Sequence, residues 1–85
     1  MEYVAVAFRS RSDTVRFYEF LKSNGFRTEI INTPKEAGVG CGLSVKVPPS
    51  MIPTIKKAIK ISGIGSFSGF FLVKTVAGRR VVKSV

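Results

Sequence analysis

The sequence predicts a small α+β domain in which two helices alternate with four strands and a short strand follows. Three observations support this class. Apolar residues alternate with polar ones in several short segments, they recur at helical spacing in two others, and proline or glycine separates the segments. The chain has 85 residues, of which 45% are hydrophobic, and this suits one domain over residues 1–85.

The first half of the chain predicts a central strand and a helix. Residues 3–9 have two apolar or small faces, which is typical of a strand that is buried on both sides. Ser10 or Ser12 is the expected N-cap of a helix over residues 12–24, because a serine side chain accepts backbone N–H groups there. The residues expected on the buried face of this helix are Thr14, Phe17, Tyr18 and Leu21.

Further strands and one more helix complete the expected order. The remaining strands are expected over residues 26–32, 43–47, 67–76 and 80–85. Ser50 is the expected N-cap of a second helix over residues 50–62.

The resulting order, βαββαβ and a short terminal strand, fits a ferredoxin-like sandwich. This fold has a four-stranded antiparallel sheet with two helices on one face. Residues 74–85 are expected to add a hairpin strand, which either pairs in the same sheet or forms an edge that meets another subunit.

The composition excludes several kinds of site. The chain has no histidine, one cysteine and five acidic residues, so a tetrahedral zinc site and a hydrolase with a catalytic histidine are excluded. A single cysteine cannot form an intramolecular disulfide, and this fits a reducing compartment. The N-terminus lacks a signal-peptide pattern, and no apolar run approaches the roughly 20 residues of a spanning helix. We therefore expect a cytoplasmic carrier or binding protein, more than an enzyme, with no membrane contact and no cofactor.

Positive charge is concentrated in the second half of the chain. The formal net charge is +9, yet residues 1–45 are almost balanced, and residues 46–85 have eight basic residues and no acidic one. Such a surplus favours an anionic partner, either RNA or an acidic protein surface. The candidate contact residues are Lys46, Lys56, Lys57, Lys60, Arg79 and Arg80.

The candidate functional residue is Cys41, in the segment over residues 33–43, which we call the cysteine loop. Gly40 and Gly42 flank the cysteine, so the backbone can turn sharply and little side-chain cover surrounds the sulfur. A lone cysteine can equally be a small, buried apolar residue.

The element order brings the cysteine loop to the same end of the sheet as residues 9–12 and 62–66. The start of the first helix and nearby basic side chains would favour a thiolate over a thiol, and the thiolate is the reactive form. The basic residues expected near Cys41 are Arg9, Arg11 and Lys35. The backbone N–H groups of Gly40 and Gly42 are expected to add to this anion-stabilising environment.

Several segments of residues 3–73 resemble a family of small bacterial and archaeal proteins described as putative selenium/sulfur carrier-like. The segments that carry the resemblance are Tyr3–Phe8, Leu21–Phe26, Thr33-Pro34-Lys35, Cys41-Gly42-Leu43 and Pro48-Pro49. The resemblance implies a thiol that holds sulfur or selenium, with Cys41 at the matching position.

The sequence leaves two functions open. In the first, the protein carries sulfur or selenium on Cys41, as a persulfide in the case of sulfur, and receives it from a donor protein. In the second, the basic half of the chain serves a nucleic-acid-binding or protein-interaction module. RNA would then bind an open sheet face with Tyr3, Ser44 and Lys46, and the apolar segment 69–73 would pair with a second copy to form a homodimer.

Overall fold

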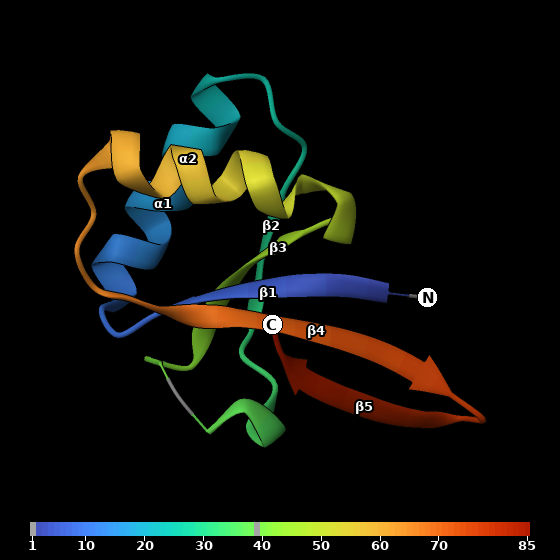
Figure 1. Cartoon of the computed structure of the whole chain (residues 1–85). Helices are drawn as coiled ribbons and strands as arrows, with labels where there is room; N and C mark the ends of the chain where they lie inside the picture. The colour runs from blue at the N-terminus through green and yellow to red at the C-terminus, as the bar shows by residue number, and fades with distance from the viewer. Residues whose placement is uncertain (1, 39) are drawn as a thin grey trace.

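A five-stranded antiparallel sheet and two helices make up the computed structural model, which describes residues 2–38 and 40–85 (Figure 1). The strand order is β2-β3-β1-β4-β5. The elements are β1 (Glu2–Phe8), α1 (Arg11–Ser23), β2 (Glu29–Asn32), the 3₁₀ helix η1 (Lys35–Ala37), β3 (Leu43–Val47), the 3₁₀ helix η2 (Pro49–Met51), α2 (Ile52–Ser62), β4 (Phe67–Val76) and β5 (Arg79–Ser84). The α+β class is confirmed. The C-terminal strand that the sequence predicts pairs along β4 in the same sheet. The sheet therefore has five strands, and the four-stranded ferredoxin-like arrangement is not confirmed.

The central strand of the sheet is β1, which pairs with β3 on one side and β4 on the other. Val4, Val6 and Phe8 are fully buried on the face that carries α1 and α2. The Phe8 ring centre lies 5.2 Å from that of Phe17 on α1 and 6.0 Å from that of Phe67 on β4. Large apolar side chains on this face thus hold both helices against the sheet.

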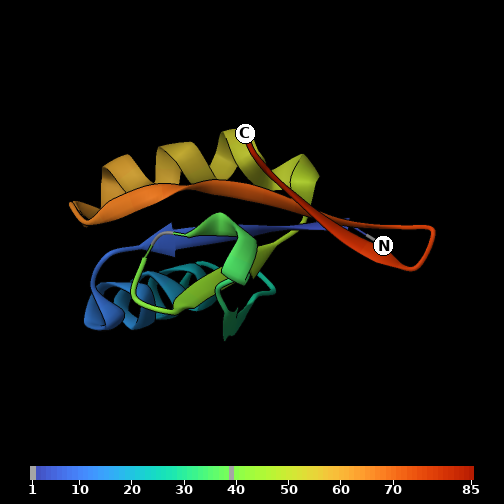
Figure 2. The same cartoon turned by 90° about the horizontal axis from the view of Figure 1, so that it is seen from below.

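A second, smaller core lies on the opposite face of the sheet. Ala5 and Ala7 of β1 and Phe71 of β4 are buried in it. The partly buried side chains that pack around them are Ile31, Ala37 and Val82. Figure 2 looks onto this face, with η1 in green and the β4–β5 hairpin in orange and red. Because the alanines are small, Ala37 of η1 and Val82 of β5 can pack close to this face of β1.

The sheet face that we expected to be open is partly covered by these elements. Ser44 is fully buried, and its hydroxyl lies 2.7 Å from Oγ1 of Thr33, so the expectation that Ser44 faces a ligand is wrong. Tyr3 and Lys46 are half-buried near the end of the sheet. Residues 69–73, which we expected to pair with a second copy, lie in β4 between β1 and β5.

The first helix is capped as the sequence predicts. Ser10, the first of the two candidate serines, is the N-cap, and its Oγ accepts a hydrogen bond of 3.2 Å from the backbone N–H of Asp13. The backbone N–H of Phe26 donates to the carbonyl of Leu21 at 3.0 Å. This bond ties residue 26 to the end of α1, and β2 therefore begins at Glu29 rather than at residue 26.

The second helix begins later than expected. Ser50 lies within η2, and α2 begins at Ile52 without a side-chain cap, so the prediction that Ser50 is the N-cap is wrong. Pro53 lies in the first turn of α2, where its missing N–H costs nothing. Over the described part of the chain, neither helix has the length and apolar character needed to cross a membrane.

Candidate functional site

The backbone of Cys41 is fixed to the end of the central strand. Its N–H donates to the carbonyl of Phe8 at 3.1 Å, and the N–H of Thr33 closes the loop by donating to the carbonyl of Gly42 at 2.9 Å. Gly40 has a φ of +90°, and a Cβ there would lie only 3.1 Å from the same Phe8 carbonyl oxygen. Glycine is therefore favoured at position 40 for both backbone conformation and space.

The sulfur of Cys41 is half-buried and lies near two oxygen atoms. Sγ is 3.6 Å from Oγ1 of Thr14 on α1 and 3.7 Å from the carbonyl oxygen of Leu43. The Thr14 hydroxyl, which is fully buried, is 3.0 Å from the carbonyl oxygen of Ser10 and can donate to it. When the Thr14 hydroxyl donates its one proton to Ser10, the S–H of Cys41 can donate to the Thr14 oxygen or to the carbonyl of Leu43. When the sulfur is a thiolate, the hydroxyl can instead turn and donate to the sulfur.

The three connections that the element order predicts at one end of the sheet do meet. The backbone N–H of Arg9 donates to the carbonyl of Ser66 at 2.8 Å. The Ser66 hydroxyl donates to Oδ2 of Asp13 at 2.6 Å, and Thr14, the next residue on α1, is beside Cys41. This expectation is confirmed, and it places the sulfur beside the first turns of α1.

The basic side chains that the sequence places near the sulfur form no described hydrogen bond to it. In the described residues, no hydrogen bond joins the sulfur to the exposed Arg9 or Arg11. The charged side chain within the connecting network is the acid Asp13, whose Oδ1 also pairs with Arg16 at 3.3 Å. A basic environment of Cys41 therefore stays a prediction.

Lys35 and the loop glycines line a hollow formed by the cysteine loop itself. Its volume is about 230 Å³, and its lining residues are Thr33, Pro34, Lys35, Gly38, Gly40 and Gly42. Cys41 is not among them, since its side chain turns towards α1 instead. The flanking glycines thus face a different space from the sulfur.

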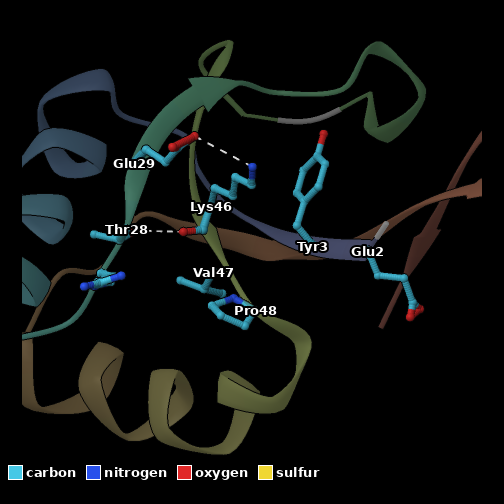
Figure 3. Close-up of a pocket in the computed structure, with 8 residues that line it drawn as sticks. Glu2, Tyr3, Thr28, Glu29, Lys46, Val47 and Pro48 are labelled. Atoms are coloured by element: carbon cyan, nitrogen blue, oxygen red, sulfur yellow. Dashed lines mark hydrogen bonds and ion pairs between the residues drawn. The ribbon is translucent and has the colours of Figure 1, made fainter.

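Two of the candidate basic residues are paired with acids from the first half of the chain. Lys46 Nζ lies 3.7 Å from Oε1 of Glu29 and 5.0 Å from the centre of the Tyr3 ring. Figure 3 shows these side chains at a hollow of about 220 Å³. Arg80 forms two hydrogen bonds, of 2.8 and 3.1 Å, with Glu36 of η1.

The ion pair between Arg80 and Glu36 shifts both titrations. The hydrogen bond from Arg80 and a backbone hydrogen bond lower the pKa of Glu36 from its ordinary value of 4.5. The same side-chain bond raises the pKa of Arg80. This exposed pair connects β5 to η1, which lies within the cysteine loop.

The other candidate basic residues stay exposed. Lys56, Lys57 and Lys60 lie on α2, and Arg79 begins β5. In residues 2–38 and 40–85, none of them forms an ion pair with an acidic side chain. The basic half of the sequence is therefore divided into structural ion pairs and a separate exposed set.

Sequence reasoning missed the role of Thr14 beside the sulfur. The signal was a polar residue on the face of the first helix that was expected to be buried. It also did not identify Asp13 and Ser66 as the pair that joins two of the connections. Among the described residues, no three cysteine, aspartate or glutamate side chains are grouped so that they could hold a metal ion.

A family model described as "Putative Se/S carrier protein-like" matches residues 2–66. The match contains the cysteine loop and α1, and it ends before β4. The comparisons with curated proteins and with solved structures gave no significant match.

Proposed function

The chain belongs to the family described as "Putative Se/S carrier protein-like", and from this premise we propose that it carries sulfur or selenium on Cys41. The observation that supports the proposal most strongly is the setting of this thiol. Cys41 is the one cysteine of the chain, lies within the matched residues, and has a half-buried sulfur beside a hydroxyl and a carbonyl oxygen. A reducing compartment such as the cytoplasm would keep the thiol free.

Loading is a transfer of sulfane sulfur between thiols. The thiolate of Cys41 attacks the terminal sulfur of a persulfide on the donor, and a new S–S bond forms as the donor S–S bond breaks. The donor leaves as a thiolate, and the terminal sulfur keeps its proton or its negative charge, so no oxidant or reductant is consumed. Unloading is the same exchange, with an acceptor nucleophile attacking the terminal sulfur and Cys41 leaving as a thiolate.

The residues around Cys41 have distinct parts in this exchange. The Thr14 hydroxyl can turn from the carbonyl of Ser10 and donate to the sulfur when it is anionic. The hydrogen bond from the Cys41 N–H to Phe8 keeps the backbone in place while the sulfur exchanges its partner. Partial burial limits the access of stray thiols that would remove the terminal sulfur.

Mass spectrometry of the intact protein tests the proposal. The protein is incubated with a cysteine desulfurase and cysteine, or with a selenocysteine lyase and selenocysteine, and then trapped with an alkylating reagent. Cys41 is expected to gain one sulfur or selenium atom that a reducing agent removes, and Cys41→Ser is expected to gain none. Failure to gain either atom, from the enzymes and from glutathione persulfide alike, would contradict the proposal.

A further inference from the structure

The exposed face of α2 has positive charge that the fold does not use. Lys56, Lys57 and Lys60 are exposed, α2 has no acidic residue, and within the described residues these lysines form no ion pair. Lys60 lies in the last turn, where the helix dipole favours a cation. Lys56 and Lys57 lie too far from that end to benefit, and like charges at positions 56 and 60 repel one another. Stability therefore does not account for this set.

Apolar hollows flank the lysines on both sides of the helix. Lys56 and Lys60 border a hollow of about 290 Å³, whose other lining residues are Ile59, Phe67 and Phe70. Lys57 borders a second hollow, of about 280 Å³, whose lining includes Phe20, Phe26, Ala58 and Ile61. Ile61 is 77% exposed, which is unusual for a large aliphatic side chain in a small domain. Positive charge and accessible apolar surface thus alternate along α2.

This surface is linked to the cysteine loop through residues 63–66 and the start of α1. α2 continues into residues 63–66, and Ser66 bonds to the backbone of Arg9 and to the carboxylate of Asp13. Thr14, next to Asp13, contacts the sulfur of Cys41. Figure 1 shows the end of α2 and the start of α1 at the same end of the sheet, on the left. A protein bound along the last turns of α2 would therefore lie at the end of the molecule that holds the thiol.

We propose that the α2 surface, formed by Lys56, Lys57, Lys60 and Ile61, docks an acidic protein that presents apolar side chains between its carboxylates. That this partner delivers or receives the sulfur of Cys41 rests on the proposed function; the docking itself does not. Carboxylates would pair with the lysines, and apolar side chains would enter the hollows. Nucleic acid fits less well, because none of the rings at the hollows is fully exposed as a platform for a base. Phe70 is only 4% exposed, and the other rings, Phe20, Phe26 and Phe67, are partly buried against the core.

Fluorescence anisotropy with a synthetic peptide tests the docking surface. The probe is an amphipathic helix with glutamates on one face and leucines on the other, and the comparison probes are its scrambled sequence and a single-stranded oligo-U RNA. The protein is expected to bind the amphipathic peptide more tightly than either comparison probe. Equal binding of the scrambled peptide would overturn the proposal. So would tighter binding of the RNA that is lost when Lys56, Lys57 and Lys60 are changed to glutamate.

A charge-matched pair of variants locates the surface. Lys56→Glu, Lys57→Glu and Lys60→Glu together are expected to weaken peptide binding at least about tenfold. The control combines Lys22→Glu, Arg27→Glu and Lys83→Glu, which change the net charge equally at exposed positions elsewhere and should weaken binding by about threefold or less. Equal losses in both variants would show that net charge alone attracts the peptide. Ile61→Ser should weaken binding about fivefold without changing the charge.

Two further measurements separate a loss of docking from unfolding of the variant and from a failure of persulfide formation. If circular dichroism shows that the variant with Lys56, Lys57 and Lys60 changed to glutamate is unfolded, the same three lysines are changed to glutamine instead. Peptide binding is expected to weaken in that variant too. Cys41→Ser should bind the peptide as the wild type does, so a failure of persulfide formation would leave the docking result standing.

Sulfur transfer to Cys41 then tests the link to function. The lysine variant is expected to accept sulfur from a cysteine desulfurase about tenfold more slowly, and from glutathione persulfide at the wild-type rate. An equal slowing with both donors would show that the lysines act on the thiol itself and would overturn docking as their role in transfer. Unchanged rates with both donors would overturn the link between the α2 surface and the carrier function.

Discussion

Two alanine substitutions on either side of Cys41 test whether backbone packing fixes the cysteine loop. Gly40 and Gly42 have nearly the same backbone angle, with φ values of +90° and +93°. A Cβ at position 40 would lie 3.1 Å from the carbonyl oxygen of Phe8, whereas one at position 42 would have no atom within 4 Å. The two variants therefore share a positive φ and differ in one contact that is shorter than ordinary van der Waals distance.

The expected destabilisation follows from this difference. An L-residue at such a positive φ costs about 1–2 kcal/mol, and this is the whole expected effect of Gly42→Ala. In Gly40→Ala the Phe8 carbonyl must also move, although β1 holds it in the centre of the sheet and it accepts the Cys41 N–H at 3.1 Å. Loss of that hydrogen bond adds about 1 kcal/mol. For a domain of this size, the additional loss corresponds to a melting temperature lower by about 4–8 °C.

Thermal and urea unfolding, followed by circular dichroism, measure the two variants under the same conditions. The alkylation rate of Cys41 by iodoacetamide provides a local measurement beside them. Gly40→Ala should be less stable than Gly42→Ala and should react several-fold faster, because the loop leaves the end of β1. Equal stability of the two variants, or an alkylation rate of Gly40→Ala equal to that of the wild type, would refute the assigned contact.

Three further predictions concern the fold and the thiol. Ionised Glu36 has a lowered pKa, so its pair with Arg80 should stabilise the fold above about pH 4.5 and lose this effect as the pH falls through the lowered value; urea midpoints measured across that range should show no such loss in Arg80→Ala. Thr14→Val should shorten the lifetime of the persulfide on Cys41 about fivefold in a thiol-quench assay, as expected for one lost hydrogen bond, and an unchanged lifetime would exclude a role for the hydroxyl. Phe17→Ala should cost about 3–5 kcal/mol in urea unfolding, because its ring is fully buried between the helix and the sheet; a cost below about 1 kcal/mol would contradict the packing.

Periodicity was sufficient to predict the elements that face the main core. The alternation in residues 3–9 and the helical spacing of residues 14–21 follow directly from which side chains lie against the sheet. The convergence of three connections at one end of the sheet also followed from the element order alone. These features depend on local pattern and on chain direction, and the sequence carries both.

The second core could not be predicted in the same way. Its members come from distant segments, and two of them, Ala5 and Ala7, are small residues whose pattern does not say what covers them. The short η1 has no periodic signal, and its contact with β5 includes an ion pair between Glu36 and Arg80, 44 residues apart. Ser50 looked like a helix cap by type, but Pro53 in the first turn sets the start of α2 further along the chain.

The charge asymmetry of the sequence is partly offset in the fold, where acids of the first half pair with cations of the second. Read along the chain, residues 46–85 form one basic block. In the structure, three of its cations pair with acids of the first half, at distances of 2.8 to 3.9 Å. These pairs are Lys46 with Glu29, Lys74 with Glu2, and Arg80 with Glu36. They join strands or connect β5 to η1, so they contribute to the assembly of the sheet more than to an attraction for RNA.

The remaining positive charge is therefore more local than the composition suggests. Of the five cations in residues 46–85 outside these pairs, three lie on α2. The segment that follows α2 leads to Ser66, which bonds to Asp13, and the next residue, Thr14, contacts Cys41. A uniformly basic surface would attract any polyanion, but three lysines beside apolar hollows can select a partner by both charge and shape. A carrier needs that selectivity, because its thiol must exchange sulfur with chosen proteins and not with the abundant small thiols around it. The basic side chains thus divide into those that pair with acids across the sheet and the exposed lysines of α2. This division is the property of the fold that best supports a protein partner over a nucleic acid.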